Sequence, residues 1–271
     1  MVNKNRAVFF ISDRTGITAE ALGSSLLSQF ESLDFTKTHL SFIDTLDKAS
    51  DAVEKVNNAS LETGEQALVF STQIDNEFRA MLSKSNCVFF DFFDTFISKM
   101  EYSLDLKSSH AAGRSHGVNY NSNYSDRISS INFALGSDDG LGSKNYENAD
   151  LILIGVSRSG KTPNCLFMAL QYGINAANYP LIDQDLENTQ LPKSLQQYKH
   201  KLFGLTINPT RLQKIRDKRR GNSNYSSLRQ CQNEVKRAED LYYANHIPFI
   251  DVTQTSIEEI STKIINKLSL R

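Results

Sequence analysis

Short apolar runs alternate with amphipathic stretches along most of this chain. Each apolar run predicts a buried β-strand, and together they cover residues 7–11, 39–43, 67–70, 151–154, 176–182, 201–207 and 247–252. Apolar residues at helical spacing lie between them, over residues 18–30, 47–57, 74–83, 126–135, 164–172, 209–220, 225–245 and 256–268. Residues 88–93 are also apolar, but Asp91 and Asp94 leave their type open. The alternation predicts parallel sheets with helices on both faces.

A polar segment interrupts this pattern between residues 102 and 125. Ser, Asn, Gly and His dominate it from residue 108 onward, without an apolar period. Such a segment is either a linker or a loop over a functional site. We therefore divide the chain into an N-terminal α/β region (1–107), a connecting loop and helix (108–150) and a C-terminal domain (151–271), and find no internal sequence repeat.

The stretch after the predicted strand at 151–154 has the spacing of a phosphate-binding loop, G-x-x-x-x-G-K-T. Its candidate nucleotide-binding residues are Gly155, Val156, Ser157, Arg158, Ser159, Gly160, Lys161 and Thr162. The two glycines are expected to adopt φ values that other residues resist, so that successive N–H groups point into one concavity. Lys161 adds a cation for phosphate oxygens, and the Thr162 hydroxyl is placed to bind Mg²⁺. The alternative is an ordinary glycine-rich turn between a strand and a helix.

This loop and its flanking elements set the fold class. We predict an α/β protein, with a parallel-sheet βα region at the N-terminus followed by a P-loop kinase-like α/β domain that binds a nucleotide. The expected chemistry is phosphoryl transfer or other nucleotide-driven work. The turn at residues 12–16 also joins a strand to a helix, but it lacks a Lys and the G-x-G-x-x-G spacing. It is interpreted as a strand-end pocket of unknown content.

Acidic residues supply the candidates for metal binding and proton transfer. Asp251, at the end of a predicted strand, is the first candidate for a second Mg²⁺ ligand, and Asp183 is the next. Asp138 and Asp139 precede Gly140 and form a pair that could bind a metal or act as a general base. Each has an ordinary alternative, because carboxylates also cap helices and occur in Asp-Gly turns.

Basic residues add candidates for phosphate binding. His116 lies in the polar segment and could move a proton or bind phosphate, although a lone loop histidine is more often solvated. Arg114 and Arg158 could clamp phosphate through their guanidinium groups. The helix predicted at 209–220 carries a basic run, interpreted as a solvated or partner-facing surface. Its members are Arg211, Lys214, Arg216, Lys218, Arg219 and Arg220.

The composition narrows the function class. A formal net charge of -1 over 271 residues gives no global field that would attract nucleic acid or an anionic membrane. No apolar run approaches the length of a membrane span, and residues 1–6 lead into a strand without a signal-peptide region. Cys87, Cys165 and Cys231 have no metal-site spacing, so we expect reduced thiols and a cytoplasmic protein.

Several motifs taken together resemble a known family. In chain order they are the stretch at residues 8–20, His116-Gly117, Asp126-Arg127-Ile128, Asp138-Asp139-Gly140 and the stretch at residues 155–163. Further matches lie at residues 176–180, 201–209, 225–231 and 256–259. Over essentially its whole length the chain is similar to the bacterial regulatory proteins that act on phosphoenolpyruvate synthase, with the pyruvate phosphate dikinase regulators as close relatives. Arg14 departs from the small or acidic residues found in that family's first turn.

The resemblance implies a bifunctional serine/threonine kinase and pyrophosphorylase. Such regulators inactivate their target enzyme by phosphorylating a threonine with ADP as the donor. They restore it by a dephosphorylation that uses inorganic phosphate (Pi) and releases pyrophosphate. The resemblance therefore implies ADP and Pi as co-substrates and phosphoenolpyruvate synthase as partner, and it is compatible with a homodimer. We also expect Mg²⁺, held by Thr162 and Asp251.

The resemblance also suggests roles for the other candidate residues. Lys161 and Arg158 would offset charge as the phosphoryl group moves. Asp139, or its neighbour Asp138, would be the base for the target threonine hydroxyl. His116 and the turn at residues 12–16 would face the protein substrate or Pi.

Other interpretations stay open. The same chemistry could act on pyruvate phosphate dikinase. A small-molecule kinase of the shikimate or gluconate type shares the strand, loop and helix, but the long region before the loop favours a protein substrate. A nucleotide sensor without turnover is a third interpretation, and a nucleic-acid binder is disfavoured by the near-neutral charge.

Overall fold

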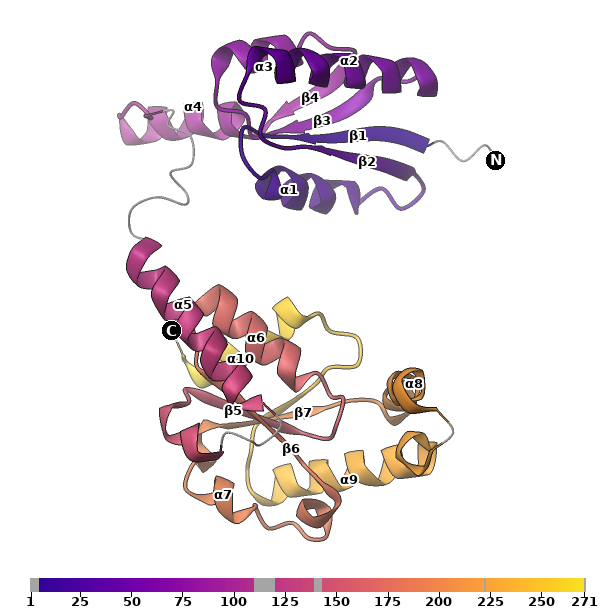
Figure 1. The fold of residues 1–271 in the computed structure, drawn as a ribbon, viewed down its shortest axis with the longest axis vertical. Coiled ribbons are helices and arrows are strands. Elements are labelled where there is room, and N and C mark those ends of the chain that lie inside the picture. The colour runs from indigo at the N-terminus through magenta and orange to yellow at the C-terminus, as the bar shows by residue number, and fades with distance from the viewer. Residues whose placement is uncertain (1–4, 110–119, 139–142, 222, 271) are drawn as a thin grey trace. The chain divides into compact units, whose positions relative to one another are not determined.

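The computed structural model describes residues 5–109, 120–138, 143–221 and 223–270, with residues 120–124 and 143–144 described by their backbone alone (Figure 1). These residues form two compact units, Met1–Val118 and Asn119–Arg271. Each unit is built on its own four-stranded parallel sheet, which confirms the predicted α/β class. Helix α5 (Tyr120–Gly136), from the predicted connecting region, packs on α6 (Lys161–Tyr172) and belongs to the second unit.

In the first unit the strands lie in the order β2–β1–β3–β4. The strands are β1 (Asn5–Ile11), β2 (Asp34–Leu40), β3 (Ala67–Ser71) and β4 (Cys87–Asp91). The helices are α1 (Ile17–Leu27), α2 (Leu46–Thr63), α3 (Asn76–Leu82) and α4 (Phe92–Leu104). Helices α2 and α3 cover one face of the sheet and α1 covers the other (Figure 1).

The central strand β1 is apolar because both of its faces are buried. Phe9 and Ile11 pack with side chains of α2 and α3, whereas Val8 and Phe10 pack with α1. A parallel strand covered on both sides reads as a continuous apolar run rather than an alternating one. This is why the pattern identified β1 directly.

The second unit has the same strand order, as β6–β5–β7–β8. Its strands are β5 (Leu151–Gly155), β6 (Ala176–Pro180), β7 (Leu202–Thr206) and β8 (Phe249–Asp251). With α5 and α6, its longer helices are α8 (Pro209–Arg220), α9 (Leu228–Ala244) and α10 (Ile257–Leu268). Short helical turns complete it: η3 (Ser143–Asn148), η4 (Asp183–Leu186), α7 (Lys193–Gln196), η5 (Lys199–Lys201) and η6 (Asn224–Ser226). Helices α8 and α9 cover one face of the sheet, and α5, α6 and α10 cover the other.

Two helices begin in an unusual way, and both follow the central strand of a sheet. Thr45, Asn208 and Ser256 cap α2, α8 and α10 with a side-chain oxygen, the common arrangement. Helices α1 and α6 are instead preceded by Gly16 and Gly160, which are both left-handed and provide no side-chain cap. In the described residues neither helix start is capped by a side chain, unlike those of α2, α8 and α10.

Some boundaries differ from the predictions. Strand β2 was predicted at residues 39–43 but spans Asp34–Leu40, because it lies at the sheet edge and its largely polar residues are mostly exposed. The open question at residues 88–93 is resolved at Asp91, which ends β4 and caps α4. No described helix is both long enough and apolar enough to cross a membrane.

Candidate functional site

Two glycines frame the loop between β5 and α6, and each is needed for a different reason. A Cβ on Gly155 would lie 2.7 Å from Ser159 Oγ and 2.9 Å from the Leu205 carbonyl oxygen, so close packing is the constraint there. Gly160, the residue before α6, has a φ of +87°, which lies in the left-handed region that favours glycine. The expectation of an unusual φ is confirmed at Gly160 and wrong at Gly155, where available space decides.

Arg158 takes the second left-handed position of the loop, with a φ of 73°. A residue with a side chain is strained in this region by about 1–3 kcal/mol, so neighbouring contacts must hold it there. Left-handed residues within a turn aim successive N–H groups at one side, which makes a concavity for an anion. Ser159 Oγ is buried in the same loop and has no protein partner in the part of the chain that the structure describes. These donors fit a phosphate group.

Lys161 is the first residue of α6, and its ammonium group lies at the loop. The side chain is almost fully buried, and Nζ donates to the carbonyl oxygens of Gly155 and Val156, each at 3.0 Å. These contacts hold the positive charge beside the concavity. Lys161 is therefore placed to meet phosphate oxygens, as the motif predicts.

Thr162 contacts one of the two predicted carboxylates. Thr162 Oγ1 donates to Asp138 Oδ1 at 2.8 Å, and Asn178 Nδ2 donates to the same oxygen. Asn178, in β6, is buried, and its backbone N–H donates to the Ser137 carbonyl oxygen at 3.3 Å. Residues from three segments thus bring a carboxylate to the hydroxyl that the motif assigns to Mg²⁺.

Asn178 was not among the predicted site residues. It lies in a strand whose other described side chains are apolar, at Ala176, Ala177, Tyr179 and Pro180. A polar side chain buried within a β-strand needs a hydrogen-bond partner, and this is the signal that could have identified it.

The other two metal candidates already accept hydrogen bonds from other groups of the protein. Asp251 is exposed, and its Oδ1 accepts a hydrogen bond from the backbone N–H of Thr253 at 2.8 Å and another from the Thr253 hydroxyl. Asp183 Oδ1 accepts from Gln230 Nε2 at 3.3 Å. Within the described ranges no three His, Cys, Asp or Glu residues gather as a metal site would require. A role for Asp251 in metal binding stays a prediction.

Three predicted residues lie outside the described ranges. These are His116, Asp139 and Arg114. Their roles stay predictions.

A hollow of about 470 Å³ adjoins the loop. Ile207, Ile215 and Val252 supply part of its apolar wall, and Arg158 and Arg211 also line it. Apolar walls with a few polar groups are typical of pockets for small organic ligands. The hollow is therefore placed to receive the part of a nucleotide that lies beyond its phosphates.

The basic run on α8 does not form a single solvated surface. Arg211 lines the hollow, and Lys214, Lys218 and Arg219 are exposed as expected. Arg216 is fully buried and forms an ion pair with Glu234 of α9, with Nη2 and Oε2 2.6 Å apart. Helical spacing could have separated Arg216 from its neighbours, because it follows the buried Leu212 by one turn.

Cys165 lies behind the loop in α6, and its thiol is inert. The side chain is fully buried, and burial raises the pKa of the thiol far above its usual value. It stays protonated at neutral pH, so it is not a nucleophile.

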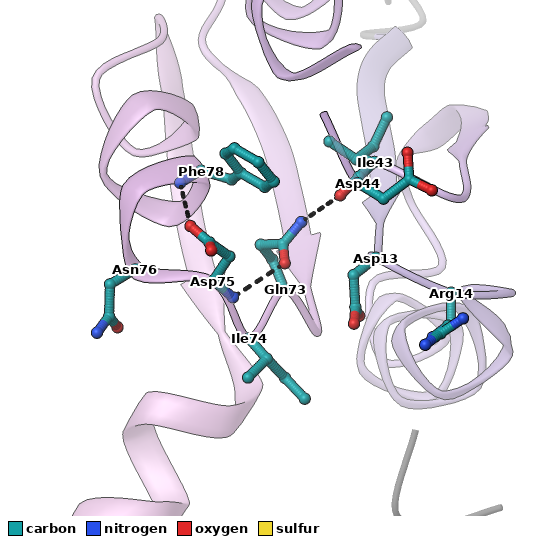
Figure 2. Close-up of a pocket in the computed structure, with 9 residues that line it drawn as sticks. All are labelled: Asp13, Arg14, Ile43, Asp44, Gln73, Ile74, Asp75, Asn76 and Phe78. Atoms are coloured by element: carbon teal, nitrogen blue, oxygen red, sulfur yellow. Dashed lines mark hydrogen bonds between the residues drawn. The ribbon is translucent and has the colours of Figure 1, made fainter. Parts of the chain in front are cut away.

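The turn at residues 12–16 lines a second hollow, of about 450 Å³, in the first unit. Figure 2 shows Asp13 and Arg14 on one side of it and Asp75 and Asn76 on the other. Asp44 also lines it, and a hydrogen bond from Lys48 holds the pKa of Asp44 below its usual value. Three carboxylates beside one guanidinium make this hollow unsuited to Pi.

The buried floor of this second hollow is held by an amide. Gln73 Nε2 donates to the Ile43 carbonyl oxygen at 2.8 Å, and Gln73 Oε1 accepts from the Asp75 backbone N–H at 3.1 Å (Figure 2). Asp75 in turn caps α3 through Phe78 and Glu77. The segments that follow β2 and β3 are thereby connected at the carboxyl edge of the sheet, where ligands bind in open parallel sheets.

Comparison with known proteins places both units in one family. A sequence profile of the kinase/pyrophosphorylase family matches residues 8–265. A protein from Alkalilimnicola ehrlichii, provisionally named a phosphoenolpyruvate synthase regulatory protein, is 54% identical over 270 residues, covering 100% of this chain and 98% of its own. Proteins with the same provisional name from Pseudomonas aeruginosa (strain LESB58) and Stutzerimonas stutzeri (strain A1501) are 53% and 51% identical over 260 residues. These alignments cover 96% of this chain and 95% and 96% of those relatives. The chain therefore belongs to the kinase/pyrophosphorylase family.

Proposed function

We propose that this chain is a bifunctional regulator of phosphoenolpyruvate synthase. In one direction it inactivates the synthase by transferring the β-phosphoryl group of ADP to a threonine. In the other it restores the synthase by transferring that phosphoryl group to Pi, which releases pyrophosphate. The family supports the two activities, and the names of the relatives support the target.

One observation carries the proposal. The hydrogen bond from Thr162 Oγ1 to Asp138 Oδ1 joins the phosphate loop to the segment that contains the predicted base. A nucleotide loop alone suits any nucleotide-binding protein, whereas a carboxylate at the metal-binding hydroxyl suits phosphoryl transfer.

ADP fits the loop and the hollow beside it. Its two phosphates would lie against the loop at residues 156–160, with the Arg158 N–H as a donor, and against the start of α6, where the helix dipole favours an anion. Lys161 and Arg158 would meet the phosphate oxygens. The nucleoside would enter the hollow that Ile207 and Arg211 help to line.

Mg²⁺ fits the oxygen donors of Thr162 and Asp138. The ion prefers hydroxyl, carboxylate, phosphate and water oxygens, and it usually keeps several waters. When bound, it would offset the negative charge that accumulates on the phosphate oxygens. Asp251 is the weaker candidate, because its carboxylate already serves a turn.

In the kinase direction the target threonine oxygen attacks the β-phosphorus of ADP. The new bond joins that oxygen to phosphorus, the bond from the β-phosphorus to the bridging oxygen breaks, and AMP leaves. Asp139 would accept the hydroxyl proton, since the two donors on Asp138 Oδ1 suit that neighbour to binding rather than to proton transfer. Lys161 and Arg158 would stabilise the charge as it moves to the leaving AMP.

In the reverse direction a Pi oxygen attacks the phosphothreonine. The bond from phosphorus to the threonine oxygen breaks, that oxygen regains a proton, and pyrophosphate forms. Pi would lie near the place of the β-phosphate of ADP, on the side that the α-phosphate of AMP occupies, because a loop that binds two phosphates in ADP also fits pyrophosphate. The acidic hollow of Figure 2 suits basic groups of the protein substrate better than Pi. His116 as a contact for Pi or for the substrate stays a prediction.

The test is transfer of label from β-³²P-ADP to purified phosphoenolpyruvate synthase, with γ-labelled ATP and pyruvate phosphate dikinase in parallel. We expect label on a synthase threonine from ADP alone, and its removal by Pi as labelled pyrophosphate. Label on the dikinase alone would keep the chemistry and change the target. Nucleotide binding without transfer to either protein would leave a small-molecule kinase or a sensor.

The two carboxylates can be separated by substitution. Asp139→Asn is expected to lower the transfer rate by at least 100-fold while ADP affinity changes little, since general-base groups contribute about 10²–10⁴-fold. Asp138→Asn is expected to weaken the dependence on Mg²⁺ as well as the rate. Transfer rates and Mg²⁺ titrations measure both effects. Full kinase activity in Asp139→Asn would refute the assignment of the base.

A further inference from the structure

Arg216 is a buried charge that the proposed reaction does not use. Its side chain is 0% exposed, and Glu234 faces it through two parallel contacts, Nη1 to Oε1 at 3.1 Å and Nη2 to Oε2 at 2.6 Å. A two-point ion pair of this kind fixes the plane of the guanidinium group as well as its position. Burying such a pair costs desolvation free energy, so the pair itself does not account for an arginine here.

The same guanidinium reaches the phosphate loop. Nη2 donates to the Ser157 carbonyl oxygen at 3.0 Å, and Nη1 donates to the Tyr225 carbonyl oxygen at 3.0 Å. The Tyr225 ring lies over the guanidinium, with its centroid 4.3 Å from Cζ. The Tyr225 hydroxyl lies 2.9 Å from Ser157 Oγ. Ser157 is therefore held at its backbone by Arg216 and at its side chain by Tyr225.

These contacts set the orientation of one peptide group. The Ser157 carbonyl and the Arg158 N–H belong to the same planar trans peptide, so they point in opposite directions. With the carbonyl directed to the buried guanidinium, the Arg158 N–H is directed away from it. In the part of the chain that the structure describes, this N–H donates to no protein acceptor. It is available to a phosphate oxygen.

The contacts also address the strain at Arg158. That residue is left-handed without being glycine, and the peptide before it is the one that Arg216 holds. A loop with such a residue would relax to another conformation if its neighbours did not restrain it. Arg216 and Tyr225 are placed to supply that restraint before any ligand arrives.

We propose that Arg216, fixed by Glu234 and assisted by the Tyr225 hydroxyl, is a positioning residue that preorganises the phosphate loop for the diphosphate of its ligand. The inference rests on the proposed function only for the identity of that ligand as ADP. In this role Arg216 touches neither the ligand nor the reacting atoms. Its effect passes through the Ser157–Arg158 peptide.

The first test removes the Tyr225 hydroxyl and keeps its ring. Tyr225→Phe is expected to raise the Kd for ADP and for pyrophosphate by about 5-fold, the effect of one hydrogen bond. The Kd for adenosine should stay within about 2-fold, because the nucleoside is expected to bind in the hollow beside the loop, which residue 157 does not line. Ser157→Ala should have a similar effect, and the double variant should be no worse than either single one. Isothermal titration calorimetry measures all three ligands, and Tyr243→Phe, at an exposed tyrosine, is the matched control.

The second test removes the buried pair without leaving a lone charge. Arg216→Met with Glu234→Leu replaces the pair by apolar side chains, a change that often preserves stability. We expect the Kd for ADP and for pyrophosphate to rise at least about 10-fold, with adenosine binding retained. Arg219→Met, at an exposed position of the same helix, is the control. Urea unfolding reports any loss of stability separately.

The outcomes separate the inference from the proposed function. If the unmodified protein binds pyrophosphate but not ADP, the proposal of ADP as phosphoryl donor is wrong. The positioning role of Arg216 can then still be tested with pyrophosphate. If the unmodified protein binds neither ligand, both the proposed function and the positioning role of Arg216 are refuted. Equal losses for adenosine and ADP, additive effects of Tyr225→Phe and Ser157→Ala, or unchanged ADP affinity in the Arg216→Met/Glu234→Leu variant would each overturn the positioning role.

Discussion

The two units share one backbone plan and differ in what they present at the same place. In each, the first strand is central, and the loop that follows it ends at a left-handed glycine without a side-chain cap, Gly16 in one and Gly160 in the other. The loops, residues 12–16 and 156–160, have equal length. After the glycine the first unit continues with the exposed Ile17 and the second with the buried Lys161.

This difference shows that the fold provides the location of a site and that the side chains there determine what it can bind. A parallel sheet supplies a crevice at the carboxyl ends of its central strands, whatever the sequence. The first unit surrounds that crevice with Asp13, Asp44 and Asp75, and the second places Lys161 and Arg158 there. The fold alone therefore does not indicate a phosphate site, and the side chains at the crevice do.

The largest expected effect comes from the residue after the glycine. Lys161→Met should weaken ADP binding by roughly 30- to 150-fold, because a hydrogen bond to a charged group contributes about 2–3 kcal/mol. Ile17→Met, the same change in the first unit, should leave the Kd for ADP unchanged. Calorimetric titration of both variants measures the contrast. A similar loss in Ile17→Met would mean that the two crevices act together, and the comparison would break.

A smaller effect is expected from filling two tightly packed glycine positions, one in each unit. A Cβ on Gly23 would lie 2.6 Å from the Phe10 ring, and a Cβ on Gly204 would lie 2.8 Å from Phe249 and from the Tyr242 ring. Each Gly→Ala change should lower the free energy of unfolding by about 1–3 kcal/mol, measured by urea titration. Gly136→Ala, where a Cβ meets nothing within 4 Å, is the control.

ADP affinity should separate these two glycine variants. The Tyr242 hydroxyl lies 3.2 Å from the carbonyl oxygens of Ile154 and Leu205, next to the first loop glycine. Displacing that ring in Gly204→Ala should disturb the loop and raise the Kd for ADP. Gly23→Ala should leave it unchanged. Equal affinity in both variants would show that the loop tolerates movement of its support.

The smallest effect concerns the thiols. Cys87 of the first unit is partly exposed, whereas Cys165 and Cys231 of the second are fully buried, and burial raises the pKa of all three. Labelling of the native protein with a disulfide reagent at pH 8 should be slow and should begin at Cys87, since only the thiolate reacts. The rate at Cys87 should increase as the pH rises toward that raised pKa. Faster labelling at Cys165 would mean that the second unit opens more readily than its packing indicates.

Strands that are buried on both faces were easier to predict from the sequence than strands with exposed side chains. Strands β1 and β5 are covered on both faces, and their continuous apolar runs identified them. Strand β2 has mostly exposed side chains such as Thr36 and Lys37, so periodicity placed it too late in the chain. Its position is set by pairing with β1, and that long-range constraint is not visible in a local pattern.

The candidate residues were predictable where a short local motif marks them, as at the phosphate loop and at Asp138-Asp139-Gly140. The loop motif identified Lys161 and Thr162 because their spacing is itself the signal. Asn178 and Arg216 come from other elements, and their partners are set by the tertiary fold. The basic run on α8 therefore suggested a solvated or partner-facing surface at Arg216, whereas Arg216 lies with Leu212 on the buried face of the helix.

The contacts of Arg216 with Glu234 and with the phosphate loop can form only late in synthesis of the chain. Ser157 and its partner Arg216 are 59 residues apart, and Glu234 is synthesised later still. During translation the loop and α6 therefore leave the ribosome before Arg216 and Glu234 do, by a delay on the order of several seconds. A chain cut short between α6 and α8 would carry the complete G-x-x-x-x-G-K-T signature without the contacts that shape it. During biosynthesis the capacity to hold a diphosphate would thus emerge with the C-terminal helices, well after the residues that bind it.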